Sequence, residues 1–277
     1  MEPLEPRYTA ELFRPLLQEL VVLLRSLEPE MWNRPTVAGQ WRVRDIAAHL
    51  LDGDLRRLAI CRDGHRIPME PITSDRDLAR FINRLNAEGV DHGRRWSDQL
   101  LIDLIAVTGD WVAEYFVALP PHDQAVFSVS WAGEAVSENW MDVGRDYTER
   151  WHHQMQIRDA VGQPRLLSPL WLEPLIELSI RALPPAYSAV AAPEGSTITL
   201  QVHGDTEGSW TLLREDDGWR LRRGRPRTAT TTVSIAADDV WRLFFNALSA
   251  EAATERVLVE GNRALAAPLL GARSVIV

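Results

Sequence analysis

The hydrophobic pattern changes its period at Pro164, and this change constrains the fold more than any other feature of the sequence. Before it, apolar residues recur at three- and four-residue steps, starting with Leu12 and Leu16, as they do along one face of an amphipathic helix. After it, short segments of strand-like alternation predominate. We therefore expect two domains, a helical one over residues 1–165 and a mixed α+β one over residues 166–277.

The N-terminal part is expected to form an antiparallel helical bundle. Pro120 and Pro121 stop one helical segment, and Gly162 fits the C-terminal cap of the last one. We take four of the five periodic segments as main helices in about 160 residues, which is typical of a four-helix bundle. Helical periodicity covers about residues 8–27, 43–62, 77–91, 99–119 and 141–161, with a loop over 61–75.

The C-terminal part is expected to be a small α+β domain. A short helix over 171–183 is predicted to end at Pro184 and Pro185. Asp216, Asp217 and Gly218 separate two alternating segments and give a hairpin signal. The predicted strands cover 197–203, 209–215, 218–223, 230–236, 256–261 and 274–277, and further helices cover 238–248 and 262–270.

Composition and charge argue against several classes of function. The 277 residues carry a net charge of −9 and no basic run, which argues against binding to nucleic acid. The acidic N-terminus lacks the features of a signal peptide, and no apolar stretch approaches the ~20 residues that cross a bilayer. The single cysteine, Cys61, allows no internal disulfide. We expect a cytoplasmic bacterial protein that acts on small molecules.

All thirty basic residues are arginines. The absence of lysine excludes catalysis through a Schiff-base lysine. It leaves arginine to bind carboxylates, which its planar guanidinium does with two parallel hydrogen bonds.

Glu149 and His153 are four residues apart in DYTERWHHQMQIRDAVG and project from one helix face. A carboxylate and an imidazole in this arrangement can bind one divalent ion, with a third ligand from another helix. His152 is an alternative to His153, because a three-residue Glu-to-His spacing also binds metals in helical bundles. Taken alone, however, the spacing favours a solvated Glu–His pair.

His49 lies in the middle of the helix expected over 43–62, one turn after Asp45. We expect Asp45 to accept a hydrogen bond from the imidazole. Such a bond can orient a metal-bound ring, but on a helix surface it is more often an ordinary pair of neighbours.

The segment GQWRVRDIAAHLLDGD, followed about 100 residues later by YTERWHHQMQIRDAVG, resembles the mycothiol-dependent maleylpyruvate isomerase family. That family belongs to the DinB-like group of metal-binding four-helix bundles. The tail, with WRLFFNAL and VLVEGNRALAAPLL, resembles the family's C-terminal domain, which is similar to sterol carrier proteins. The resemblance covers nearly the whole chain. It implies a DinB-like antiparallel four-helix bundle followed by a sterol carrier-like α+β domain.

The resemblance also implies a metal site. In the family a divalent metal, usually zinc, is held by the histidine of W-x-V-x-D-x-x-x-H, by a glutamate, and by a histidine four residues after the glutamate. These positions are His49, Glu149 and His153 here, with His152 as the substitute ligand.

The family's named reaction uses a small thiol, mycothiol, as cosubstrate. The thiol adds to the double bond of maleylpyruvate, the resulting single bond rotates, and elimination gives fumarylpyruvate. This chemistry needs a thiolate, which a bound metal stabilises. It also needs positive charge near the developing enolate.

Carboxylates of the substrate or thiol would need arginine partners. Arg84 in the bundle, and Arg220 and Arg222 with the adjacent Arg223 in the second domain, are the candidates, although arginines are usually surface residues. Cys61 is not expected to be the nucleophile, because it lies roughly 18 Å along the helix axis from His49.

The expected function is therefore that of a metal- and thiol-dependent isomerase or S-transferase acting on a small electrophile. One alternative is a non-enzymatic protein that binds a lipid or another small molecule in its C-terminal domain, and another is a regulatory relative that keeps the metal without turnover. The doubled His152-His153 and the Arg158-Asp159 that follow indicate a subgroup of the family. Maleylpyruvate is thus a family label here rather than a predicted substrate, and the oligomeric state is not predicted.

Overall fold

The computed structural model describes residues 1–66 and 72–275, and the chain in it divides into two compact units. Among the described residues, one unit, the sheet unit, comprises 1–7, 127–148 and 166–275; the other, the helical unit, comprises 8–126 and 149–165. The division falls inside helix α5 (Asn139–Val161). The boundary between residues 165 and 166 stays a prediction.

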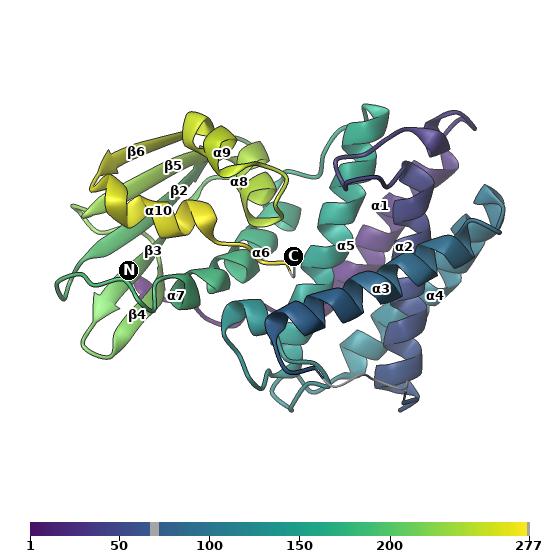
Figure 1. Ribbon diagram of the computed structural model, residues 1–277, viewed down its shortest axis with the longest axis horizontal. Helices are drawn as coiled ribbons and strands as arrows, with labels where there is room; N and C mark the ends of the chain where they lie inside the picture. The colour runs from purple at the N-terminus through teal and green to yellow at the C-terminus, as the bar shows by residue number, and fades with distance from the viewer. Residues whose placement is uncertain (67–71, 276–277) are drawn as a thin grey trace. The chain divides into compact units, whose positions relative to one another are not determined.

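The helical unit contains α-helices close to the predicted ranges (Figure 1). The side chains of Ser74 and Ser97 begin two of them, since each hydroxyl accepts a hydrogen bond from a backbone N–H of the first turn. The helices are α1 (Phe13–Arg25), α2 (Val43–Arg57), α3 (Asp75–Gly93), α4 (Asp98–Ala118) and the second half of α5.

Four of these helices share the core of the unit. Leu24 of α1, Leu51 of α2, Ile105 of α4 and Ile157 of α5 are each at most 1% exposed and belong to one apolar cluster. Among the described residues, α3 adds no side chain to this cluster and packs instead against α2. The α+β fold class with an N-terminal four-helix bundle is thus confirmed, and α3 is an addition to the bundle.

The sheet unit is built on a sheet whose strand order, among the described residues, is β1-β4-β3-β2-β5-β6. β2 and β5 are parallel and every other neighbouring pair is antiparallel. Glu215 pairs with Gly218 across the β3–β4 turn, which confirms the predicted hairpin. The strands are β1 (Glu2–Pro3), β2 (Thr197–His203), β3 (Gly208–Glu215), β4 (Gly218–Arg223), β5 (Thr231–Ala236) and β6 (Val257–Gly261).

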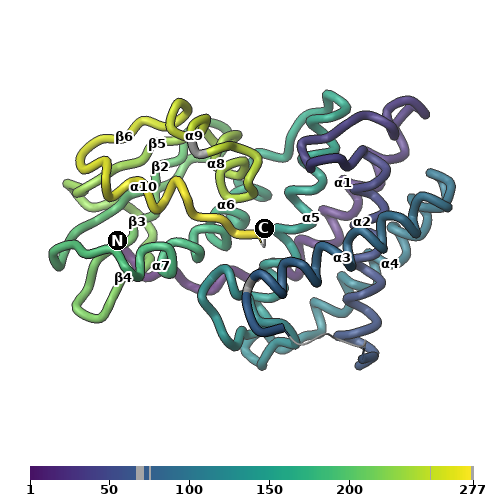
Figure 2. The backbone as a smooth tube through the Cα atoms, in the orientation of Figure 1, coloured from purple at the N-terminus to yellow at the C-terminus, as the bar shows by residue number. Residues whose placement is uncertain are grey.

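Helices cover the apolar face of this sheet, as the backbone trace in Figure 2 shows for α8 and α10. Alternation along the strands places Leu200 and Val233 side by side on that face, and both are fully buried. Trp241 and Phe244 of α8 are also fully buried. The helices of the unit are α6 (Pro169–Ser179), α7 (Leu183–Ala186), α8 (Ala237–Phe244), α9 (Ala250–Arg256) and α10 (Arg263–Gly271).

The structure corrects two details of the predicted elements. Pro184 and Pro185 do not end the helical segment but lie in the first turn of α7, where a missing N–H costs no hydrogen bond. The sequence reading also missed α9, although Ser249 caps it in the usual way.

Two predicted segments reach residues that the structure does not describe. The terminal strand over 274–277 and the loop over 61–75 extend in part outside the described residues. Within the part of the chain that is described, Ser274 and Val275 form a bend, and Leu58–Arg62 is a π-helical turn that continues α2.

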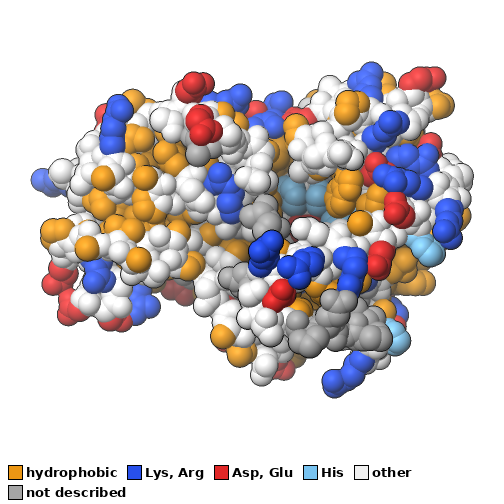
Figure 3. All heavy atoms as spheres, in the orientation of Figure 1, with side chains coloured by type: hydrophobic (Ala, Val, Ile, Leu, Met, Phe, Trp, Pro, Cys, Tyr) orange, Lys and Arg blue, Asp and Glu red, His pale blue; other side chains and the backbone are white. Residues whose placement is uncertain are grey.

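Among the described residues, no helix combines the length and the apolar character that a membrane span requires. Arginine and acidic side chains are interspersed on the face drawn in Figure 3, with no field of a single sign.

Candidate metal centre

Helix α2 begins at Val43 because the preceding residue and Asp45 cap its N-terminus. The backbone N–H of Arg42 donates a hydrogen bond of 3.0 Å to the Asp45 carboxylate, and the Nε atom of Arg94 donates one of 3.1 Å to the other carboxylate oxygen. A carboxylate at this position meets the unpaired N–H groups and the positive end of the helix dipole. His49 then follows one turn after Asp45, within the regular part of the helix.

The predicted hydrogen bond between His49 and Asp45 is wrong. The Asp45 carboxylate is engaged at the helix start, and the buried Nδ1 atom of His49 has no hydrogen-bond partner among the described residues. The other ring nitrogen, Nε2, points toward α5 and makes the contact on which the site depends.

His49, Glu149 and His153 converge on one point in the helical unit. The Nε2 atom of His49 lies 3.2 Å from Oε1 of Glu149, and the Nε2 atom of His153 lies 3.1 Å from the same oxygen. One ligand atom from each of the three residues lies within 4.8 Å of the other two. The structure thus brings together the three residues that the sequence singled out.

The three side chains differ in their access to solvent. The imidazoles of His49 and His153 are 6% and 8% exposed, whereas the Glu149 side chain is 37% exposed. The group is therefore closed on the side of the imidazoles and open on the side of the carboxylate. An open position is the feature that distinguishes catalytic from purely structural metal sites.

Burial and charge set the protonation of this group. Burial of the ring lowers the pKa of His49 to about 4, although its hydrogen bond to Glu149 acts in the opposite direction. Burial alone would raise the pKa of Glu149, but attraction to His153 and the hydrogen bonds from both imidazoles lower it well below its usual value. At neutral pH, His49 is neutral and Glu149 is ionised, which are the forms that bind metals.

Gln156 orients His153 from the far side of the ring. The Oε1 atom of its amide lies 2.8 Å from Nδ1 of His153. Since an amide oxygen only accepts, Nδ1–H donates this bond, so the Nε2 atom would be the one to offer a lone pair when a metal displaces its proton. The sequence reading missed Gln156, although its position three residues after His153 on the same helix was a usable signal.

Trp41 and His152 flank the group. The Trp41 ring lies 4.9 Å from the His49 ring and 6.1 Å from the His153 ring, measured between centroids. His152 stacks on His153 at 4.0 Å, but its Nδ1 atom is 3.9 Å from Glu149, farther than either ring that faces Oε1. His153 is thus better placed than His152 as a ligand. Trp41, also missed as a site residue, is the tryptophan of the W-x-V-x-D-x-x-x-H segment.

The donor set and its spacing fit a zinc-type ion. Two imidazole nitrogens and one carboxylate oxygen are ligands that zinc accepts at about 2.0–2.2 Å, and two ligands of a tetrahedral ion at that distance are about 3.3–3.5 Å apart. The two observed nitrogen–oxygen separations, 3.2 and 3.1 Å, are close to this value. The third separation, between the two imidazole nitrogens, is within the 4.8 Å that bounds all three ligand atoms.

The arginines proposed for substrate binding lie on other elements. Arg84 on α3 is 3.9 Å from Glu88 and stacks over Phe81, and its side chain is 45% exposed. On β4 of the sheet unit, Arg220 pairs with Asp217 and Arg222 with Glu215, whereas Arg223 pairs with Glu173 and Glu177. A role for these arginines in binding stays a prediction.

Comparison with known families and structures agrees with the fold. The family model described as the mycothiol maleylpyruvate isomerase N-terminal domain matches residues 13–158, which include all three residues of the group. No curated protein matches the chain in sequence.

Two crystal structures of mycothiol-dependent maleylpyruvate isomerase, one of them a mutant, are similar over 91% of this chain and 91% of theirs. Their TM-score is 0.55 for both, at 10% and 11% sequence identity, so the likeness extends to the fold. The solution structure of a sterol carrier protein domain from Helicoverpa armigera aligns with 28% of this chain and 65% of that chain, at 20% identity and a TM-score of 0.24. That score is too low to carry an argument about the C-terminal part.

Proposed function

This chain belongs to the mycothiol maleylpyruvate isomerase family, and from that premise we propose that it is a metal-dependent enzyme that uses a small thiol on an electrophilic substrate. The metal is a divalent ion, with zinc as the expected one, and mycothiol is the expected thiol. The reaction is an isomerisation through reversible thiol addition, or an S-transfer. Which small electrophile it acts on is left open, because one metal platform serves several thiol-dependent reactions.

The observation that carries this proposal is that the Nε2 atoms of His49 and His153 both lie next to the same oxygen, Oε1 of Glu149. Two buried imidazoles and an anionic carboxylate have no obvious role in stabilising the bundle, because burying such polar groups costs free energy. The same three groups are well suited to a divalent ion, and the partly exposed side of Glu149 leaves access for a ligand.

Each residue has a separate task in the proposed site. His49, Glu149 and His153 hold the ion, and Gln156 accepts a hydrogen bond from Nδ1–H of His153, which leaves Nε2 as the ligand atom. Trp41 covers the two imidazoles and limits the approach of water from that side. When bound, the ion supplies the positive charge that stabilises a thiolate at neutral pH.

Cys61 is not part of this proposal. Its Sγ atom is 3.5 Å from an Arg57 guanidinium nitrogen, and it lies in the π-helical turn after α2, three turns beyond His49. The thiol is therefore expected to come from the cosubstrate.

The test is a metal analysis followed by a thiol-dependent activity screen. Protein purified without chelators should contain about one divalent ion per chain. The metal-loaded protein is then assayed for conjugation and cis–trans isomerisation with mycothiol, bacillithiol and glutathione, beside the variants His49→Ala and Cys61→Ser. We expect thiol-dependent activity that His49→Ala abolishes and Cys61→Ser leaves intact.

Two results would overturn the proposal. One is folded protein, never exposed to a chelator, that holds no divalent ion and cannot be loaded with one. The other is activity that needs no added thiol and disappears in a folded Cys61→Ser variant, which would make the internal cysteine the nucleophile. Protein that binds the metal but is inactive toward every electrophile tested would favour a regulatory relative. Protein that holds stoichiometric lipid and no metal would favour a lipid carrier.

A further inference from the structure

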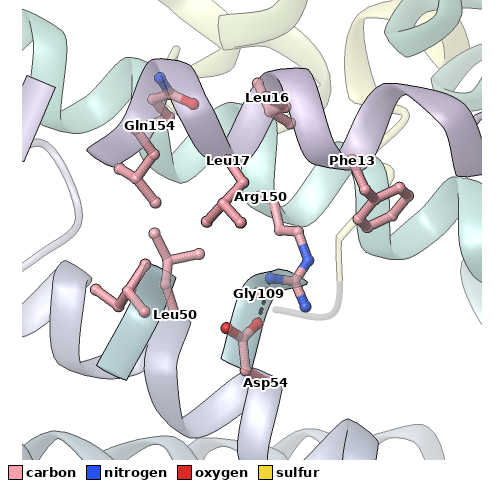
Figure 4. A pocket seen from close by; sticks show the side chains of 10 residues that line it. Phe13, Leu16, Leu17, Leu50, Asp54, Gly109, Arg150 and Gln154 are labelled. Carbon is pink, nitrogen blue, oxygen red and sulfur yellow. Dashed lines mark hydrogen bonds and ion pairs between the residues drawn. The ribbon is translucent and has the colours of Figure 1, made fainter. Parts of the chain in front are cut away.

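A buried ion pair joins the same two helices that carry the metal-binding group. The guanidinium of Arg150 on α5 donates to the carboxylate of Asp54 on α2 (Figure 4). The side chain of Asp54 is 2% exposed and that of Arg150 is 15% exposed. Arg150 directly follows Glu149, and Asp54 lies five residues after His49, about 7.5 Å further along the helix axis.

Neighbouring groups hold both partners of this pair in place. The hydroxyl of Thr108 on α4 donates a hydrogen bond of 2.8 Å to the second carboxylate oxygen of Asp54. The Arg150 guanidinium also lies 5.6 Å from the centroid of the Phe13 ring on α1. The pair is thus anchored to each of the other two helices that share the core.

The surroundings of the pair are mostly apolar. A cavity of about 20 Å³ beside it is lined by side chains that include Leu16, Leu17 and Leu50, and Gly109 opens the space on the α4 side (Figure 4). A volume of this size holds about one water molecule. An ion pair in such surroundings is little screened by solvent, so its geometry is strongly held.

We propose that Asp54 and Arg150 are positioning residues, which fix α2 against α5 so that His49 meets Glu149 and His153 at metal-binding distance. This inference rests on the proposed function, because it assigns the pair a role in that same site. Arg150 is not a ligand in this proposal, and neither residue is proposed to touch the substrate.

Positioning is needed here because the apolar contacts between the helices are not directional. Packing of apolar side chains allows some scatter in how one helix lies against another, whereas metal ligands must lie within about 0.2 Å of their preferred distances. Contacts at position 49 and at position 54 together fix both the sliding and the rotation of α2. Without the contact at position 54, the contact at position 49 alone would have to keep α2 at the rotation and height that the metal ligands require.

A second ion pair in the same unit, whose carboxylate is more exposed, provides a control. Arg158 on α5 donates a hydrogen bond of 2.8 Å to Glu19 on α1, and Arg158 lies five residues after His153. This pair also ties α5 to a neighbouring helix, but α1 carries none of the three proposed ligands. Loss of it should affect stability without changing the register of α2 against α5.

The experiment measures Co²⁺ binding, with its visible absorption band as a report on ligand geometry. The full-length variants are Asp54→Asn, the double variant Asp54→Asn/Arg150→Gln, which removes both charges of the pair, Thr108→Val, and the control Glu19→Gln. Affinity comes from competition with a chelator, and stability comes from urea unfolding of each metal-free variant.

We expect Asp54→Asn and the double variant to bind Co²⁺ at least about tenfold more weakly than wild type, as for other residues that orient ligands, with an altered absorption band. Thr108→Val should also weaken Co²⁺ binding and alter the absorption band, but by less than the Asp54 variants do. Glu19→Gln should keep the affinity within about twofold and the band unchanged, whatever it does to stability.

Unchanged affinity and band in a folded Asp54→Asn variant would overturn the positioning role while leaving the proposed function intact. An equal loss in Glu19→Gln would also overturn it, since the effect would then follow stability alone. If both Asp54 variants fail to fold, Thr108→Val decides the question by the same two readouts. Wild-type protein that binds no Co²⁺ would instead contradict the proposed metal site itself, and the positioning role with it.

Discussion

The Nε2 atom of His49 and the Oε1 atom of Glu149 lie 3.2 Å apart, although 100 residues separate them along the chain. The first belongs to α2 and the second to α5, so an ion between them would join two helices of one core. Because the unfolded chain cannot hold these atoms together, metal binding is expected to stabilise the fold as well as to serve the chemistry.

The choice of His153 over His152 can be tested by substitution. His153→Ala should lower the affinity for zinc by more than about 100-fold, because it removes a ligand, whereas His152→Ala should lower it by about tenfold or less, as expected for a neighbour that is not a ligand. The measurement is competition with a chromophoric chelator. Equal losses in the two variants would overturn the choice of His153 over His152 as the ligand.

Gln156 is expected to matter for the metal without being a ligand. Gln156→Leu keeps the approximate size of the side chain but removes the acceptor for the Nδ1 proton of His153. The affinity for zinc should then fall by about 10- to 100-fold. Gln156→Glu keeps an acceptor and should bind nearly as well as the wild type. A Leu variant that binds zinc with wild-type affinity would remove Gln156 from the site.

Acidification should weaken the metal-free fold through His49. The pKa of this residue is about 4 in the folded chain and about 6.5 when exposed. Between these pH values the unfolded chain binds a proton that the folded chain does not, so the free energy of unfolding falls as the pH drops. The loss attributable to His49 is about 2 kcal/mol at pH 5.

Urea unfolding of metal-free protein at pH 7 and pH 5 measures this loss. The His49→Gln variant has no imidazole at position 49 to titrate. Its free energy of unfolding should therefore fall less between pH 7 and pH 5. Glu149, whose pKa is lowered, acts in the same direction but mainly below its usual pKa of 4.5. A His49→Gln variant with the same pH dependence as wild type would contradict the lowered pKa of His49.

Gly93 allows α3 to approach α2 beside the metal site. A Cβ atom at this position would lie 2.3 Å from the Cβ atom of Ala48, the residue before His49. Gly93→Ala should therefore lower the free energy of unfolding by about 1–3 kcal/mol, the usual cost of overpacking. Gly53→Ala on α2 is the control, because a Cβ there meets nothing within 4 Å. It should stabilise by about 0.5–1 kcal/mol, and a loss as large as that of Gly93→Ala would refute the steric explanation.

The sequence alone determined which segments form helices and strands, and which residues were the leading candidates for the metal. The periods of the apolar residues before and after Pro164 are local properties of the chain, and most predicted elements agree with them. The resemblance to the family added His49 to the pair formed by Glu149 and His153, which spacing alone left as an ordinary helix-surface pair.

Only the tertiary structure decided which atoms meet. Asp45 is one turn from His49 in the sequence, yet the carboxylate caps α2, and Glu149 from a distant helix takes its place beside the imidazole. The contact of Gln156 with His153, the Trp41 ring and the Asp54–Arg150 pair likewise depend on how α2, α4 and α5 pack. Periodicity fixes which face of a helix is buried, but the rotation and sliding of one helix against another follow from the packing of the whole core.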